Sequence, residues 1–114
     1  MDQRMKQIAP QDAAINDGFW NRYLDLVADI VVPYQWDLIN DRVPDAERSG
    51  CIHNFKVAAG LEEGAFIGMP FQDSDLAKWI EAAAFSLIWK PDADLEKRID
   101  EAAELIAKAQ DQDG

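Results

Sequence analysis

The stretch from residue 76 to residue 89 constrains the fold of this chain more than any other part of its sequence. Apolar residues recur along it at the spacing of one helical face: Leu76, Trp79, Ile80, Ala83, Leu87 and Ile88. Phe85 and Trp89 fall on the opposite side, so a helix here is apolar nearly all round. Such a helix needs cover on more than one side. The stretch therefore predicts an inner helix of a layered, all-α structure.

The helix expected next has a different pattern. Between residues 95 and 109 the apolar residues form a single stripe, which suits an outer helix with a solvated face: Leu95, Ile99, Ala102, Leu105, Ile106 and Ala109. Pro91 should end the first helix, and Asp92 to Asp94 offer an N-cap for the second. The sequence predicts an antiparallel hairpin of an inner and an outer helix, which is the unit of an α/α barrel.

Pro33 interrupts an earlier apolar series of helical spacing. A proline at this place removes one backbone hydrogen bond and crowds the preceding turn, so the helix either kinks or stops. We predict two helices, over residues 19–32 and 34–40, with Pro33 in the first turn of the second. Helical spacing also predicts that Trp20 and Trp79 pack in the core.

The remaining segments divide the chain into a leader and a helical part. Residues 1–16 are polar and aperiodic, and we predict a flexible leader there. Within residues 17–114, loops are expected over residues 41–52 and 60–72, with a short helix over residues 53–59 between them. Three or four helices can hardly enclose the inner helix. We therefore expect residues 17–114 to be the incomplete N-terminal part of a larger helical barrel, or else to self-associate through apolar faces.

Composition excludes several classes of function. Against 11 Lys and Arg stand 22 Asp and Glu, and the net charge of -11 argues against nucleic acid and anionic membrane surfaces as partners. A single cysteine and a single histidine exclude a disulfide framework and a Cys- or His-rich metal site within this segment. No stretch reads as a signal peptide or a membrane span, so cytoplasmic residence is the expectation.

Two pairs of residues carry potential chemistry, and each has a simpler explanation. Cys51 and His53 could form a thiolate nucleophile and its base, but in a helix they point to different sides, and we predict ordinary core or loop residues. Glu62 and Glu63 could act as paired carboxylates in glycoside hydrolysis, but adjacent side chains diverge, and we predict a solvated loop.

Gln72, Asp73 and Asp75 stand at the start of the predicted inner helix. Capping of the helix N-terminus explains the two aspartates. The starts of helices in α/α barrels often line the central cavity, so a position near the substrate is the alternative for all three residues. None of them is predicted to be catalytic.

Several phrases of the sequence, in this order and spacing, resemble the N-terminal region of the β-L-arabinofuranosidases of glycoside hydrolase family 127. They are Pro33-Tyr34-Gln35-Trp36, Asn40-Asp41, Asn54-Phe55-Lys56-Val57-Ala58-Ala59-Gly60, Gly68-Met69, Phe71-Gln72-Asp73-Ser74-Asp75-Leu76-Ala77-Lys78-Trp79-Ile80-Glu81-Ala82, Pro91-Asp92, Leu95-Glu96, Ala109-Gln110 and Asp113-Gly114. The resemblance runs from about Phe19 to Gly114, and the phrase from Phe71 to Trp79 is its most specific part.

The resemblance implies an (α/α)6 barrel and a retaining hydrolase that releases terminal β-L-arabinofuranose. It also implies a cysteine nucleophile beside a zinc ion held by cysteines and a glutamate, with a second glutamate as acid/base. Those motifs lie downstream of the matched region in the family, so no catalytic residue, metal ligand or cofactor is assigned here, and Cys51 does not inherit the nucleophile's role. The expectation is an inactive segment of such an enzyme. The alternative is a small acidic helical domain that binds other proteins.

Overall fold

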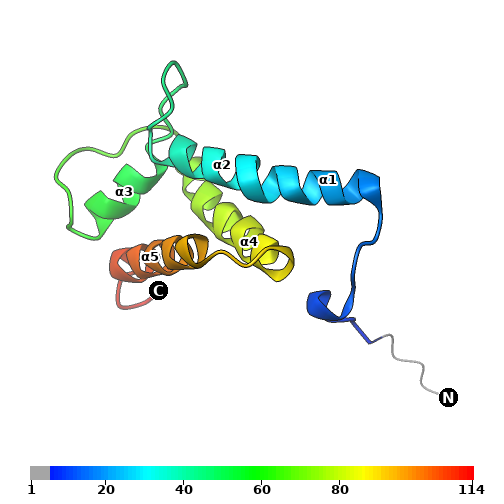
Figure 1. The fold of residues 1–114 in the computed structure, drawn as a ribbon. Helices are drawn as coiled ribbons and strands as arrows, with labels where there is room; N and C mark the ends of the chain where they lie inside the picture. Colours follow the sequence, from blue (N-terminus) through cyan, green and yellow to red (C-terminus); the bar gives the residue numbers. More distant parts are fainter. Residues whose placement is uncertain (1–5) are drawn as a thin grey trace.

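The computed structural model describes residues 6–114, and over these residues it is helical without any strand. Its main helices are α1 (Gly18–Leu26), α2 (Val32–Ile39), α3 (Cys51–Ala58), α4 (Ser74–Trp89) and α5 (Ala93–Ala109). Three short elements join or precede them: η1 (Pro10–Asp12), the π turn η2 (Val27–Val31) and η3 (Pro70–Asp73). Figure 1 shows α1 and α2 as one long rod that crosses α4, with α5 on the other side of α4.

The helical rod runs through Pro33 without a break, so the predicted stop near Val32 is wrong, whereas Pro33 does lie in the first turn of α2 as predicted. The π turn explains the difference, because in it the Val32 N–H donates to the carbonyl of Val27, five residues back. A π turn is wider than an α turn. It gives the ring of Pro33 room beside the preceding carbonyls, where a regular α-helix would be crowded. The helix therefore continues from α1 through η2 into α2.

The core lies where α4 crosses the long helix and α5. Its buried apolar residues come from all the main helices except α1: Val32, Ile39, Cys51, Ile52, Leu76, Trp79, Ala83, Leu95 and Ala102. The Trp79 indole Nε1 donates to the carbonyl oxygen of Val32 at 2.9 Å, and its ring lies 4.3 Å from that of Trp36 between centroids. This confirms the predicted core position of Trp79.

The predicted hairpin of α4 and α5 is confirmed. The helices are separated by residues 90–92, and α5 turns back against α4 (Figure 1). The side chain of Asp92 accepts from the backbone N–H groups of Asp94 at 2.9 Å and Leu95 at 3.0 Å, as an N-cap does. Leu95 and Ala102 are buried, while the opposite side of α5 carries charged, exposed residues. The chain thus pairs an inner with an outer helix.

The cap of α5 leads to the first testable prediction. Asp92→Ala should lower the free energy of unfolding by about 0.5–2 kcal/mol, because two N–H groups lose their acceptor. The control is Asp94→Ala, two positions along the same exposed helix start, where the side chain accepts no such bond. Urea unfolding followed by circular dichroism compares the two variants. Equal losses would show that the Asp92 carboxylate does not act as the cap.

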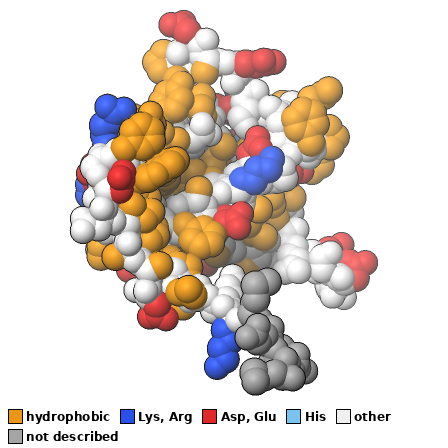
Figure 2. Space-filling view, turned by 90° about the vertical axis from the view of Figure 1, so that its right-hand side faces the viewer, with side chains coloured by type: hydrophobic (Ala, Val, Ile, Leu, Met, Phe, Trp, Pro, Cys, Tyr) orange, Lys and Arg blue, Asp and Glu red, His pale blue; other side chains and the backbone are white. Residues whose placement is uncertain are grey.

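Many large apolar side chains remain uncovered in the described part of the chain. Phe85 is 49% exposed and Trp89 is 36% exposed, as their place opposite the Leu76 face predicts. Trp20 is 57% exposed, so its predicted core position is wrong in this structure. Helical spacing placed Trp20 on an apolar face, but no described helix covers that face. Figure 2 shows hydrophobic side chains spread over the face that contains the start of α1, with a small group of charged side chains near the middle of that face.

The predicted leader lies partly within the described residues. Residues 1–5 lie outside them, whereas η1 forms a short turn that contacts α4. Ala14 and Ile15 line a groove together with Trp89 from the end of α4. Residues 6–17 therefore lie partly against the helical body.

Candidate functional site

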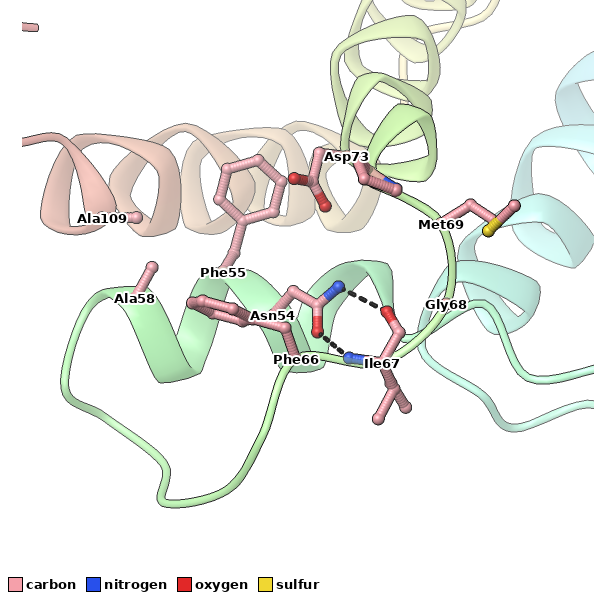
Figure 3. A pocket seen from close by; sticks show the side chains of 10 residues that line it. Asn54, Phe55, Ala58, Phe66, Ile67, Gly68, Met69, Asp73 and Ala109 are labelled. Carbon is pink, nitrogen blue, oxygen red and sulfur yellow. Dashed lines mark hydrogen bonds between the residues drawn. The ribbon is translucent and has the colours of Figure 1, made fainter.

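The loop between α3 and η3 is held against α3 by a pair of hydrogen bonds to one buried side chain of that helix. The Asn54 amide Nδ2 donates to the carbonyl of Ile67 at 2.8 Å, and its Oδ1 accepts from the Ile67 N–H at 2.9 Å (Figure 3). A side-chain amide thus pairs with one backbone unit as a neighbouring strand would. Asn54 is buried and both bonds are partly buried, so they hold the loop in place at Ile67.

His53 holds the same loop from the other side. Its Nδ1 lies 2.7 Å from the Glu62 carboxylate and its Nε2 lies 3.0 Å from the Ala65 carbonyl. Both partners are acceptors, so both ring nitrogens carry hydrogen when both bonds form. The hydrogen bond that His53 donates to Glu62, and then the one that it donates to the Ala65 carbonyl, raise the pKa of His53 above its usual value. The ring is therefore stabilised in its charged form.

A pocket of about 290 Å³ opens between α3, this loop and η3. Figure 3 shows Asp73 beside the ring of Phe55, with Phe66 from the loop on the far side of Asn54. The lining is largely apolar, and Asp73 is its only charged residue: Asn54, Phe55, Ala58, Phe66, Ile67, Gly68, Met69, Pro70, Asp73 and Ala109. Aromatic rings beside a carboxylate suit a ligand with both an apolar face and hydrogen-bond donors.

The three residues predicted to lie near a substrate do not converge on this pocket. Asp73 lines it, whereas Asp75 pairs with Lys78 at 3.0 Å and lines a groove on the side of α2. Gln72 Oε1 accepts from the backbone N–H of Met69 at 2.6 Å, which occupies its carbonyl oxygen in closing η3. Their nearness to a substrate stays a prediction. Among the described contacts, the Asp73 carboxylate has no hydrogen-bond or ion-pair partner, and Asp73 lines the pocket.

The predicted side-chain cap from Asp73 is not found, whereas Asp75 lies in the first turn of α4 as predicted. Asp73 precedes the helix but makes no side-chain capping bond. The turn is instead closed by the Gln72 side chain and by Ser74 Oγ, which donates to the carbonyl of Phe71 at 2.8 Å. The reason is that η3 runs straight into α4, so Asp73 already has helical backbone angles and cannot reach the free N–H groups.

Cys51 is a core residue, as predicted. Its side chain is fully buried, and burial, the largest cause, raises the pKa of its thiol to about 11. A thiol with such a pKa carries almost no thiolate near neutral pH, and thiolate is the nucleophilic form. His53 points to the loop and Glu62, so the two residues do not form a catalytic pair.

Among residues 6–114 no three His, Cys, Asp or Glu side chains come close enough to hold a metal ion. In the same residues no helix is both long enough and apolar enough to cross a membrane.

The charge of His53 leads to a prediction about pH. The pKa of His53 is raised in the folded protein, so the charged ring contributes to the stability of the fold. This contribution is fully present below the pKa of a free histidine, about 6.5, and is lost as the pH rises through the pKa of His53 in the folded protein. Two cations also face this pair. The charge of Arg48 lowers the pKa of His53, and Lys56, 4.0 Å from Glu62, competes with His53 for the Glu62 carboxylate. The only histidine of the chain gives a single NMR titration curve, whose midpoint should lie above that of free histidine.

Glu62→Gln serves as the matched control for this titration, because it keeps an acceptor and removes the charge. The midpoint should fall toward the free value in the variant, and the loss of melting temperature with rising pH should become smaller. A wild-type midpoint at or below the free value would contradict the hydrogen-bond geometry of His53.

Comparison with known proteins identifies the family of the chain. The model of the β-L-arabinofuranosidase GH127 catalytic domain matches residues 12–114. The chain belongs to glycoside hydrolase family 127. The non-reducing end β-L-arabinofuranosidase of Bifidobacterium longum subsp. longum is 41% identical over 115 residues, which cover 90% of this chain and 18% of that protein.

A GH127 enzyme of known structure supports the same assignment. The crystal structure of a β-L-arabinofuranosidase from Geobacillus stearothermophilus T6 superimposes with a TM-score of 0.85 and 53% sequence identity, over 88% of this chain and 16% of that one. The predicted family and the all-α class are thereby confirmed, and the fold is consistent with the N-terminal part of a GH127 (α/α)6 barrel. The chain spans less than a fifth of the length of these two GH127 relatives.

The sequence does not predict how α3 organises this site. Asn54 belongs to one of the family phrases, and the sequence gives His53 and Glu62 other possible roles. One signal was available: a histidine and an asparagine beside each other in a short helix, followed by a glycine-rich loop with an acidic residue, can hold that loop by side-chain bonds.

Proposed function

We propose that this chain forms the opening part of the catalytic barrel of a β-L-arabinofuranosidase, an enzyme that releases terminal β-L-arabinofuranose with retention. The observation that carries the proposal is the joint match in sequence and structure to a GH127 enzyme, at 53% identity and a TM-score of 0.85. A match at this level over 88% of the chain supports a shared role for the segment within the domain. The sugar substrate, and cytoplasmic residence, are proposals for the whole protein.

The residues of this chain do not fit the zinc-bound cysteine that the family resemblance implies. Cys51 is buried with a raised pKa, and residues 6–114 bring no set of three potential ligands together. We propose that any zinc ion and nucleophile in the whole protein belong to other residues. This segment then contributes mainly structural support. Asp73 is its best-placed residue for contact with a sugar, and Gln72 and Asp75 are less well placed.

A chimera tests the proposed function. The matched segment of the Bifidobacterium longum enzyme, 18% of that protein, is replaced by residues 12–114 of this chain. The chimera should hydrolyse an aryl β-L-arabinofuranoside, whereas the same enzyme without any such segment should not. A chimera that is folded by circular dichroism but inactive, beside an active parent, would contradict the proposal.

The chain by itself should not hydrolyse the same aryl glycoside above background. No nucleophile with an accessible thiolate is present in its described part, since the thiol of its only cysteine is buried. Cys51→Ser is the decisive control. Turnover by the isolated chain that disappears in this variant would make Cys51 the nucleophile and would overturn the assignment of a supporting role.

A further inference from the structure

The long helix of α1, η2 and α2 carries an apolar face that no described helix covers. Its residues lie three or four positions apart, on the side away from α4, and we call them the outward stripe: Phe19, Tyr23, Leu26, Ile30 and Tyr34. All of them are exposed, and Ile30 at the centre is 59% exposed. Three rings and two branched aliphatic side chains in one row have the composition of a core-facing helix surface.

The opposite side of the same helix is already packed. Val32 and Ile39 are buried there, and Leu24 and Val27 line grooves shared with α4. The helix is therefore apolar on two opposite sides, as α4 is, and one of the two is bare. A helix of this kind is found inside a protein with neighbours on both sides.

The Arg22 guanidinium lies over the Tyr23 ring of the stripe, 5.2 Å from its centroid, and two acidic side chains nearby are paired. Asp25 and Asp29, on the flank of the long helix, are both engaged by Lys90 from the end of α4, at 3.9 and 2.6 Å. In contrast, the free side of α5 carries paired charges such as Lys97 with Glu101 and Lys108 with Glu104. The molecule thus has a charged, solvated surface on α5 and an exposed apolar surface at the outward stripe.

We propose that the outward stripe is the docking surface for the remaining helices of a GH127 catalytic domain, and that it binds them even when they are supplied as a separate polypeptide. The proposal rests on the proposed function, because it takes the partner from the family. Its support is that this chain accounts for only 16% and 18% of the two relatives, so most of a GH127 protein lies outside the matched segment and can supply the cover for a bare apolar face.

A second copy of the chain is a poorer occupant for the stripe. Each copy carries a net charge of -11, so a dimer brings together two strongly acidic molecules. Like charges disfavour such an association, most of all at low salt.

Co-expression tests the proposal. This chain, carrying an affinity tag, is produced together with the Bifidobacterium longum enzyme that lacks its matched segment. We expect the truncated enzyme to co-purify in a 1:1 complex, and sedimentation of the isolated chain to show a monomer. Leu26→Asp and Ile30→Asp should each weaken the complex at least about 30-fold, as loss of a central interface residue does.

Ala103→Asp is the matched control, because it adds the same charge on the exposed side of α5. It should leave the complex unchanged. The two stripe variants should also melt like the wild-type chain when isolated, since their side chains are exposed in it; this separates lost docking from lost folding.

Three results would overturn the proposal: no co-purification with the wild-type chain, equal effects of the stripe variants and Ala103→Asp, or an isolated chain whose dimer is broken by Ile30→Asp. The last would make a second copy the occupant. A complex that forms while the chimera is folded but inactive would contradict the proposed activity and leave docking supported. An active chimera without a complex in trans would contradict docking alone.

Discussion

Trp79→Ala should lower the free energy of unfolding by about 3–5 kcal/mol, as the loss of a large buried aromatic side chain does. Trp79 is buried at the crossing of α4 and α2, packs against the tilted ring of Trp36 and is hydrogen-bonded to the carbonyl of Val32. Small domains have a total stability of only about 5–15 kcal/mol. Most of the tertiary structure should therefore be lost, which urea unfolding and near-UV circular dichroism would measure.

Trp79→Phe separates packing from hydrogen bonding in this prediction. Phenylalanine keeps a ring in the core but loses the hydrogen bond from the indole N–H to the Val32 carbonyl, which costs about 0.5–1.5 kcal/mol. The variant should unfold between the wild type and Trp79→Ala. If Trp79→Ala were within about 1 kcal/mol of the wild type, the contact between α4 and α2 would not hold the fold together.

Gly68→Ala should also be strongly destabilising, by about 2–5 kcal/mol. Gly68 has a φ of +75°, and an added Cβ would lie 2.8 Å from the backbone carbonyl oxygen of Ser49 and in closer conflict with the Gln72 side chain. The left-handed conformation costs a non-glycine residue about 1–2 kcal/mol. Overpacking against an immobile backbone adds about 1–3 kcal/mol. Thermal or urea unfolding would measure the sum.

Gly60→Ala is the matched control, because Gly60 has a similar φ of +69° but no atom within 4 Å of the added Cβ. It should show only the conformational cost of about 1–2 kcal/mol. Equal losses in the two variants would mean that the turn at Gly68 can move away from Ser49, contrary to the close approach in the structure.

The parts of the fold that depend on local sequence were predictable. The apolar spacing of α4, the single stripe of α5 and the stop at Pro91 all act within one or two turns, and the structure has each of them. The buried, unreactive Cys51 was also predictable, since a lone cysteine in a helix is more often a packing residue than a nucleophile.

The features that depend on distant partners were not predictable. Helical spacing gave Trp20 an apolar face but could not tell whether a neighbour covers it. The pairing of Asn54 with Ile67, 13 positions later, depends on the path of a loop that has no regular pattern. Pro33 normally ends a helix, and only packing of both flanking segments against α4 could favour continuation through a π turn.

The π turn also determines which directions the two halves of the long helix face. In a regular α-helix each residue turns the chain by about 100°, so side chains four positions apart drift around the axis. The wider turn at Val27–Val31 delays this rotation, and Leu24, Val32 and Trp36 can stay on the side of α4 although they are spaced in multiples of four. The π turn holds one residue more than an α turn, so deleting one residue there would leave Phe19 and Tyr23 facing about the same way relative to Tyr34. The same deletion elsewhere between them would rotate the two halves by about 100° and divide both the row facing α4 and the row facing away from it. The wide turn is thus the place where the long helix can change its length without disturbing either surface.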